Sequence, residues 1–183
     1  GGGVEHPGDA THAVVSVGQD EVVVETEGAA GFSRGRNLKK VGLPASDTSE
    51  LFFDNVEVPP ENILGGAEGQ GFYQMMQQLP QERLTLGCGA VGTMASAVAL
   101  TIAYAKERMA FGKPILQFQN TRFKLAECQT KTVVARAFLD QCIAEHLRGE
   151  LTAERAAMSK YWLSDTQGEV VDECLQLHGG YGY

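Results

Sequence analysis

The segment QQLPQERLTLG, residues 77–87, places a carboxylate and a guanidinium side by side in an otherwise apolar helical pattern. Glu82 and Arg83 follow Pro80 and have leucines on both sides. A carboxylate removed from water has a raised pKa, which suits it to act as a general base. The sequence therefore makes Glu82 a candidate base, and the alternative is a solvent-facing pair on a helix surface. Pro80 either bends a helix from within or begins a new one.

Two further segments carry residues that suit an anionic ligand. ERMAFGKPI, residues 107–115, puts Arg108 near a helix end before a tight exposed turn, where a guanidinium can pair with a pyrophosphate. QLHGGYGY, residues 176–183, has a glycine cluster that lets the backbone approach a ligand closely. It is not a P-loop, because no GK[ST] follows. The alternatives are a surface connector for the first segment and a helix cap with a turn for the second.

The composition is that of a soluble globular protein, with 183 residues, 43% hydrophobic, 21% charged, and a formal net charge of −8. This length suits one large or two small domains. A chain this acidic lacks the basic surface of a nucleic-acid binder. No stretch reaches the ~18 uninterrupted apolar residues of a membrane span, and the first residues do not form a signal peptide. The leading glycines and the missing initiator Met predict a fragment.

The cysteines point to buried thiols more than to a metal site. Cys142 with His146, and Cys174 with His178, are four residues apart, so one helix face could present each pair. Cys88 and Cys128 complete the set, and no CxxC pair is present. Without such a pair the metal signal is weak. We expect buried thiols in a reducing compartment and no metal.

Residues 1–60 have the pattern of β-strands. AVVSV and EVVVET are β-branched runs separated by the turn GQD, and SELFFDNVEV follows with partial alternation up to two prolines. We interpret the intervening GFSRGRNLKKVGLPASD as loops. Three or four strands make an incomplete sheet, so its apolar face requires partners outside this chain.

The pattern then changes to three long helices, predicted over about 68–107, 119–147 and 152–177, with Gly179 and Gly180 closing the third. Small residues between Gly87 and Ala97 predict close packing against other helices. In the second helix the expected buried stripe contains Phe123, Ala126, Val133, Ala137, Phe138 and Cys142. The predicted fold class is α+β, with a partial antiparallel β domain over residues 1–64 and an incomplete helical bundle over residues 65–183.

Together and in this order, these segments resemble the acyl-CoA dehydrogenase family. The resemblance covers about residues 31–183. It is carried by GFSRGRNLKKVGLPASDTSELFFDNVEVPPENILGGAEGQGF, QERL, ERMAFGKPILQFQ, the LAE of residues 125–127, and QLHGGYGY. ERxxFGxPI combined with a terminal QxxGGxGY is highly specific. LPQERL and QLHGGYGY look most like the long-chain branch.

Members of this family are flavoenzymes with an N-terminal helical domain, a middle β domain and a C-terminal four-helix domain. The resemblance implies that this chain is the end of the middle domain plus three helices of the last one. The loops that hold the flavin ring and the segment after Tyr183 would then lie outside the chain. We therefore expect the fragment alone to be inactive.

The resemblance further implies FAD-dependent α,β-dehydrogenation of acyl-CoA thioesters in fatty acid β-oxidation, with long-chain substrates. A carboxylate removes the α-proton while a hydride leaves the β-carbon for flavin N5. In the long-chain and isovaleryl branches the catalytic Glu matches Glu82, whereas most members carry it shortly after GGxGY. Glu82 is thus the implied base and Arg83 its electrostatic neighbour, and a Glu after Tyr183 stays open.

The implied FAD contacts are Arg108, Phe111, Gln119, Gln176, Gly179 and Gly180. Glu82 and Arg108 are separated by 26 helical residues, roughly 39 Å at about 1.5 Å per residue. Both cannot touch one FAD over this distance, so Arg108 would serve the flavin of a neighbouring subunit. We therefore expect a homo-oligomer, a dimer or a tetramer, with shared FAD sites.

Electron-transfer flavoprotein is the family's usual electron acceptor and is the implied partner, besides the acyl-CoA substrate. No nucleic acid and no membrane span are expected, and the expected location is the cytoplasm of a bacterium or the mitochondrial matrix of a eukaryote. Two alternatives stay open, an acyl-CoA oxidase that reoxidises its flavin with oxygen and a non-catalytic helical interaction fragment. Flavin absorbance near about 450 nm would separate the enzymes from the interaction fragment.

Overall fold

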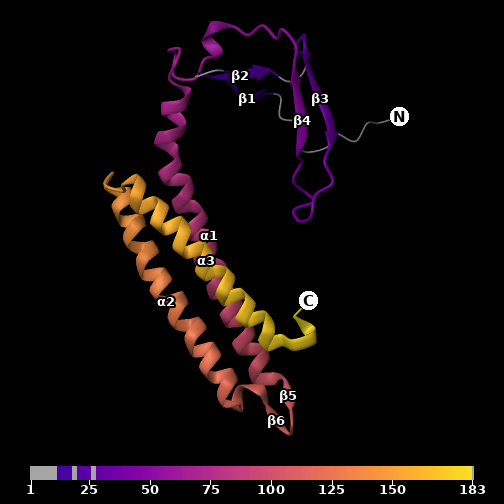
Figure 1. Ribbon diagram of the computed structural model, residues 1–183, viewed down its shortest axis with the longest axis vertical. Coiled ribbons are helices and arrows are strands. Elements are labelled where there is room, and N and C mark those ends of the chain that lie inside the picture. Colours follow the sequence, from indigo (N-terminus) through magenta and orange to yellow (C-terminus); the bar gives the residue numbers. More distant parts are fainter. Residues whose placement is uncertain (1–11, 18–19, 26–27, 183) are drawn as a thin grey trace. The chain divides into compact units, whose positions relative to one another are not determined.

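The computed structural model describes residues 12–17, 20–25 and 28–182. The chain forms two compact units, which divide between Met75 and Met76, inside helix α1. The first unit contains the first four strands, and the second contains three long helices (Figure 1). The arrangement agrees with the predicted α+β class, whereas the domain boundary proposed at residues 64 and 65 lies slightly before this division.

Before α1, the described residues of the first unit form two antiparallel strand pairs and one short helix. β1 (His12–Val17) pairs with β2 (Asp20–Glu25), as the β-branched runs predict. The turn predicted between them falls largely outside the described residues. β3 (Phe32–Asn37) pairs with β4 (Ser49–Phe53), and the 3-10 helix η1 spans Pro60–Asn62.

β3 lies in a segment that the sequence pattern marked as loop, so that interpretation is wrong for residues 32–37. Phe32 lies opposite Phe53, with ring centroids 5.3 Å apart, and this contact anchors the pair. A register shift between Arg34 and Asn37 breaks the alternation by which strands are recognised. Gly35 lies in this interval, where an added Cβ would be 3.3 Å from the Glu50 carbonyl oxygen. β4 also ends well before the two prolines at which its predicted strand ended.

α1 (Gly71–Glu107) is one continuous helix with Pro80 inside it. The hypothesis that Pro80 begins a new helix is therefore wrong. Within the second unit, α1 buries a face that recurs every three or four residues. Its buried side chains include Leu84, Ala90, Val91, Met94, Val98, Thr101 and Ala105.

By length and composition alone α1 could cross a membrane, since an 18-residue window has a mean hydropathy of 1.7. A core helix of a soluble protein passes the same test, and 33% of this window is buried inside the chain. Val91, Met94 and Val98 are part of one core with residues of the two following helices. This packing favours the prediction that α1 does not span a membrane, which stays a prediction.

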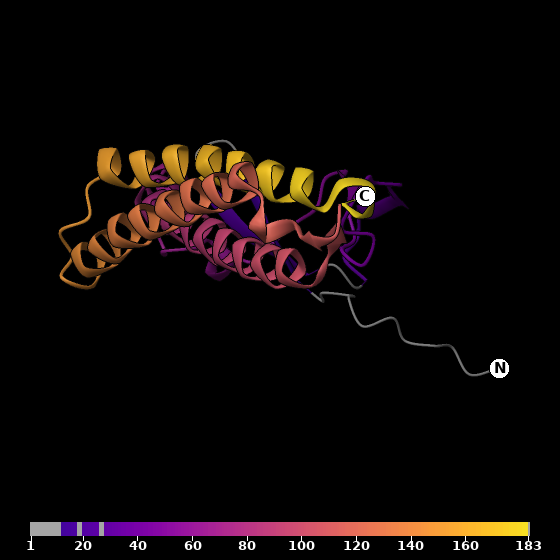
Figure 2. The same cartoon turned by 90° about the horizontal axis from the view of Figure 1, so that it is seen from below.

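α2 (Gln119–Leu147) and α3 (Ala153–His178) lie beside α1 in both views (Figures 1 and 2). The predicted bounds of α2 are confirmed, and those of α3 differ by one residue at each end. Thr152 caps α3, because its side-chain oxygen accepts a hydrogen bond from the Arg155 backbone N–H at 3.2 Å. Gly179 ends α3 with a φ of 59°.

The connections at the other end of the helices are short. β5 (Met109–Ala110) and β6 (Lys113–Pro114) form a small hairpin after α1, followed by the 3-10 helix η2 (Ile115–Gln117). After α3 the chain continues as the 3-10 helix η3 (Gly179–Tyr181). These pieces lie at the carboxyl ends of α1 and α3, where the cofactor-binding residues were predicted.

The buried stripe of α2 agrees with the predicted one only at Cys142 and at the half-buried Phe138. Phe123, Ala126, Val133 and Ala137 are exposed, and the buried residues are Thr121, Leu125, Cys128, Thr132, Ala135, Leu139 and Cys142. Both faces of α2 carry apolar residues, so periodicity alone does not distinguish them. The buried face carries smaller side chains. One of them, Thr132, is polar, and its hydroxyl donates a hydrogen bond to the Cys128 carbonyl at 2.8 Å, so that this buried polar group is not left unpaired.

Candidate functional site

Glu82 lies on α1 in the second unit, and its side chain is exposed. Arg83 is half-buried, and the next residue, Leu84, is 5% exposed and belongs to the core. The desolvation expected for a catalytic base is therefore not found at Glu82 in this chain. The helix presents the carboxylate outward, where another segment or a bound molecule can meet it.

A second cluster joins the carboxyl end of α1 to the carboxyl end of α3. The ring of Tyr104 stacks on that of His178 with centroids 4.4 Å apart, and the Tyr104 hydroxyl donates to the His178 carbonyl at 3.3 Å. The Arg108 guanidinium lies over the ring of Tyr181, 5.3 Å from its centroid. Arg108 is thus held beside the glycine-rich segment that follows α3.

The β5–β6 hairpin adds an exposed aromatic residue and a second cation to this end. Phe111 has a φ of 52° at the hairpin tip and is 96% exposed. Its ring meets that of Phe118 edge to face, with centroids 6.1 Å apart, and Lys113 Nζ lies 4.4 Å from the Phe118 centroid. The Ile115 N–H donates to the Arg108 carbonyl at 2.9 Å and closes the base of the hairpin.

The remaining predicted cofactor residues are accessible. Gln119 is exposed at the first turn of α2, and Gln176 is exposed in the last turns of α3. A Cβ added to Gly179 or Gly180 would meet no atom within 4 Å. The backbone there is open to a ligand, as the glycines predicted.

The structure therefore brings Arg108 together with the segment 176–181, and it keeps Glu82 and Arg83 far away along α1. The continuous helix that separates them confirms the basis of the distance argument. Sequence reasoning missed Tyr104 and His178, which link α1 to α3. Tyr104 precedes Arg108 by one helical turn, and this spacing was the available signal.

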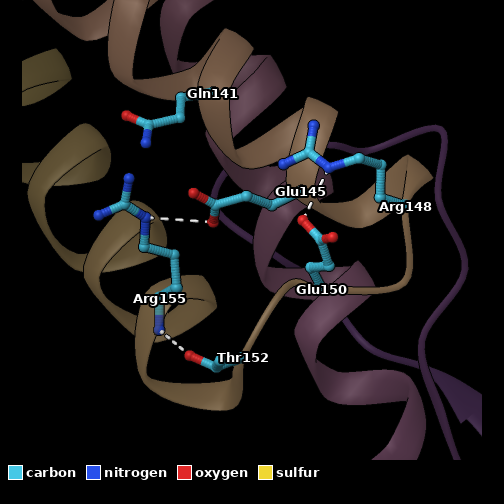
Figure 3. A pocket seen from close by; sticks show the side chains of 6 residues that line it. All are labelled: Gln141, Glu145, Arg148, Glu150, Thr152 and Arg155. Carbon is cyan, nitrogen blue, oxygen red and sulfur yellow. Dashed lines mark hydrogen bonds and ion pairs between the residues drawn. The ribbon is translucent and has the colours of Figure 1, made fainter.

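A polar pocket lies at the turn between α2 and α3, at the opposite end of these helices from the cluster of Arg108 and Tyr181. Its lining residues are Gln141, Glu145, Arg148, Glu150, Thr152 and Arg155 (Figure 3). Arg155 Nε is paired with Glu145 Oε2 at 3.2 Å, and Arg148 Nε donates to Glu150 Oε2 at 2.7 Å. The Arg155 guanidinium also lies 5.1 Å from the Phe138 ring centroid. Each cation thus has an anion, and these contacts stabilise the turn.

The small residues of α1 divide into two groups. Gly87 is closely packed, because an added Cβ would lie 2.8 Å from Leu163 Cδ1. Gly89 and Gly92 instead have open space, and they line an apolar groove that reaches Val171 of α3. Close packing is therefore confirmed at Gly87, whereas the groove leaves Gly89 and Gly92 uncovered by the described residues.

Three cysteines are buried, as predicted, and Cys88 is exposed, contrary to the prediction. Burial, with a smaller contribution from Cys174, raises the pKa of Cys128 to about 11. Burial also raises the pKa of Cys142. Within the described residues, no three His, Cys, Asp or Glu side chains gather as metal ligands.

Comparison with known proteins identifies relatives for most of the chain. The family model "Acyl-CoA dehydrogenase, C-terminal domain" matches residues 69–183, more than half of the chain. The mitochondrial long-chain specific acyl-CoA dehydrogenase of Sus scrofa is 46% identical over 156 residues, which are 85% of this chain and 36% of that protein.

Solved structures give the same result. The crystal structure of an acyl-CoA dehydrogenase from Geobacillus kaustophilus has a TM-score of 0.84 and 44% identity, over 90% of this chain and 43% of that chain. A structure named for the electron transferring flavoprotein of Acidaminococcus fermentans has a TM-score of 0.81 and 37% identity, over 90% and 43%. The chain thus spans well under half the length of its relatives.

Proposed function

Because this chain belongs to the acyl-CoA dehydrogenase family, we propose that the full-length protein catalyses the FAD-dependent α,β-dehydrogenation of acyl-CoA thioesters. The observation that carries the proposal is the cluster at the ends of α1 and α3, where Arg108, Tyr181 and the open glycines gather. Long-chain substrates are proposed because the relative from Sus scrofa is named for them.

The cluster suits the phosphate-bearing part of FAD. Arg108 and Lys113 supply positive charge for a pyrophosphate, and the exposed ring of Phe111 supplies an apolar surface. Gly179 and Gly180 leave room for close approach of the backbone, and we propose that Gln119 and Gln176 donate hydrogen bonds from the sides. FAD supplies the hydride acceptor for the substrate β-carbon when it is bound.

We assign the base to Glu82 and an electrostatic role beside it to Arg83. Removing an α-proton requires a carboxylate that is close to the substrate and shielded from water. Glu82 is exposed in this chain, so its shielding must come from the substrate and from segments outside the described residues. This requirement agrees with our expectation that the 183-residue chain alone is inactive.

The assignment of Glu82 is tested in the full-length protein by Glu82→Gln, which keeps the shape of the side chain and removes its basicity. We expect flavin content to persist and flavin reduction by acyl-CoA to fall about a hundredfold or more. Glu68→Gln, at an exposed carboxylate without an assigned role, is the matched control. Reduction at the normal rate in Glu82→Gln would move the base to a segment after Tyr183.

The length of α1 leads to the second part of the proposal, a FAD site shared between subunits. Glu82 and Arg108 lie on and directly after one unbroken helix, roughly 39 Å apart by the rise per residue. We propose that Arg108 and Phe111 contact the flavin of a neighbouring subunit in a dimer or tetramer. The apolar groove at Gly89 and Gly92 supports association, since a helix surface of small residues permits close approach.

A hybrid oligomer tests sharing directly. Full-length subunits with Arg108→Ala are mixed with subunits whose flavin-ring loops are defective. In a shared arrangement each hybrid dimer has one site with both defects and one with neither, so about half of the hybrid sites regain FAD. If each subunit builds its site alone, mixing restores no FAD and the sharing proposal is wrong.

We further propose electron-transfer flavoprotein as the electron acceptor, supported by the likeness to the structure named for that flavoprotein of Acidaminococcus fermentans. The mitochondrial relative and the bacterial one are compatible with a mitochondrial matrix or a bacterial cytoplasmic location. We retain residues 1–64 and 65–183 as the proposed domains. Their assignment is tested by expressing 65–183 alone and measuring its cooperative unfolding.

A further inference from the structure

The segment that follows α3 has few side chains to hold it in place. Three of the four residues 179–182 are glycines, and glycine loses more backbone freedom on ordering than any other residue. A Cβ added to Gly179 or Gly180 would meet no atom within 4 Å, and Tyr181 is 73% exposed. The order of this segment therefore depends on contacts at its ends, and His178 makes the first of them.

His178 is half-buried and joins the end of α3 to α1. Its ring stacks on the ring of Tyr104, with centroids 4.4 Å apart. The Tyr104 hydroxyl donates to the His178 carbonyl at 3.3 Å. That carbonyl is one of the last four of α3, which have no partner within the helix. One tyrosine thus holds both the side chain and the backbone of His178.

The His178 ring is also bound to its own helix. Nδ1 lies 2.9 Å from the Cys174 carbonyl oxygen, one turn earlier. Because a carbonyl oxygen only accepts hydrogen bonds, Nδ1 carries the proton in this contact. Cys174 is 3% exposed and belongs to the core that α1, α2 and α3 share. The orientation of the ring is therefore set by the core and not by the exposed segment that follows.

A second attachment, at Tyr181, depends on the first. The Arg108 guanidinium lies over the Tyr181 ring, 5.3 Å from its centroid. Both of these side chains are exposed, which makes this contact weaker than one that is shielded from water. Tyr104 and Arg108 are one helical turn apart, so His178 and Tyr181 meet neighbouring positions at the end of α1. Displacing His178 from Tyr104 would therefore also release Tyr181 from Arg108.

We propose that His178 is a positioning residue, which sets the fraction of molecules in which residues 179–181 lie beside Arg108 and thereby sets the affinity for FAD. His178 acts through the residues that follow it and does not itself touch FAD. The apparent Kd of a ligand is its intrinsic Kd divided by the binding-competent fraction, so a fraction of about one tenth raises the Kd about tenfold. The effect on FAD rests on the proposed function, whereas the ordering of the segment by His178 does not.

Three replacements in the full-length protein divide the contacts of His178. His178→Phe keeps a ring for Tyr104 and removes the Nδ1 donor, His178→Asn keeps an N–H near the position of Nδ1 and removes the ring, and His178→Ala removes both. Thr166→Val is the matched control, since the Thr166 hydroxyl donates to the Trp162 carbonyl at 2.7 Å, also one turn earlier on α3. It lies 12 residues before His178, roughly 18 Å along the helix.

Amide hydrogen exchange of the full-length protein without FAD tests the ordering directly. The reporters are the N–H groups of Gly179 and Gly182, which donate to the carbonyls of Gln176 and Gly179. We expect both to exchange about tenfold faster or more in His178→Ala, because local opening exposes them, and to be unchanged in Thr166→Val. Equal exchange in His178→Ala and the unchanged protein, or reporters that are already unprotected in the unchanged protein, would overturn the proposal.

Titration of the same proteins with FAD tests the consequence for the cofactor. We expect the Kd for FAD to rise about tenfold or more in His178→Ala, to rise less in the Phe and Asn variants, and to be unchanged in Thr166→Val. An unchanged Kd in His178→Ala, or an equal rise in Thr166→Val, would overturn the positioning role. If the unchanged protein binds no FAD, the proposed function is wrong and the exchange result still decides the ordering. Circular dichroism checks folding, and the Phe and Asn variants decide if His178→Ala unfolds.

Discussion

Tyr104 and His178 hold the two chain ends of the cofactor cluster together, with their rings 4.4 Å apart and inclined by 23°. The same tyrosine donates a hydrogen bond from its hydroxyl to the His178 carbonyl at 3.3 Å. Neither residue is predicted to touch FAD. Their contact nevertheless fixes where α3 ends relative to Arg108. Tyr104 and His178 thereby position the residues that are predicted to bind FAD.

Two replacements of Tyr104 distinguish the contribution of its hydrogen bond from that of its stacked ring. Tyr104→Phe keeps the ring and removes the hydroxyl, and we expect a loss of about 0.5–1.5 kcal/mol in the free energy of unfolding. Tyr104→Ala also removes the stacked ring, and we expect a loss of about 3 kcal/mol. Denaturant unfolding of both variants measures the difference. Equal losses for Phe and Ala would mean that the ring contact contributes nothing.

The helices were predictable because their signals agree with one another. The bounds of α2 followed from a breaker before Gln119 and a glycine shortly after Leu147, and the end of α3 followed from Gly179. Pro80 was ambiguous, since a proline both begins helices and occurs within them, and the unbroken course of α1 from Gly71 through Pro80 decides between the two.

Other features depend on contacts that a pattern cannot show. The sequence of β3 lacks the alternation of apolar and polar residues, because its pairing register shifts. The strand is defined by its pairing with β4, in which Phe32 lies opposite Phe53. The residue types of the cofactor cluster were recognisable in the sequence. Their gathering at one end depends on α3 returning antiparallel to α2 (Figure 1).

The turn between α2 and α3 allows burial and distance to be compared as sources of ion-pair strength. Glu145 and Arg155 are 18% and 31% exposed at 3.2 Å, whereas Arg148 and Glu150 are 55% and 60% exposed at 2.7 Å. We expect the shielded pair to have a coupling energy of about 1–2 kcal/mol and the exposed pair about 0–0.5 kcal/mol. The experiment is a double-mutant cycle for each pair by thermal or denaturant unfolding.

Each cycle uses an isosteric change at the acid and an uncharged change at the base, Glu145→Gln with Arg155→Met and Glu150→Gln with Arg148→Met. The exposed pair is the shorter one. A larger coupling there would show that distance governs these contacts and that shielding from water does not.

Glu154 gives the first turn of α3 a predicted dependence on pH. Its own backbone N–H, followed by Thr152, lowers the pKa of this carboxyl below its ordinary value. A lowered folded-state pKa stabilises the protein above the unfolded-state value, and the contribution is lost as the pH falls through the folded-state value. We expect Glu154→Gln to be less stable than the unchanged protein at about pH 6, and we expect this difference to shrink as the pH falls below about 4.

The comparison requires unfolding curves of both proteins across that range. Other carboxyls titrate equally in both proteins, so the difference between them isolates Glu154. A difference that stays constant with pH would mean that the carboxylate charge has no part in capping α3.

Two glycines on α1 provide a matched test of packing against Leu163. An alanine at Gly87 places Cβ 2.8 Å from Leu163 Cδ1 and 3.5 Å from Leu139 Cδ1, whereas one at Gly89 meets nothing within 4 Å. Both changes gain the same helix propensity, up to about 1 kcal/mol. We therefore expect Gly89→Ala to be stabilising and Gly87→Ala to lie about 1–3 kcal/mol below it, because Leu163 is fully buried and cannot move freely. Denaturant unfolding measures both, and combining Gly87→Ala with Leu163→Val should recover part of the loss if the clash is its cause. Equal stabilities for the two alanine variants would show that Leu163 accommodates the new methyl group at no cost.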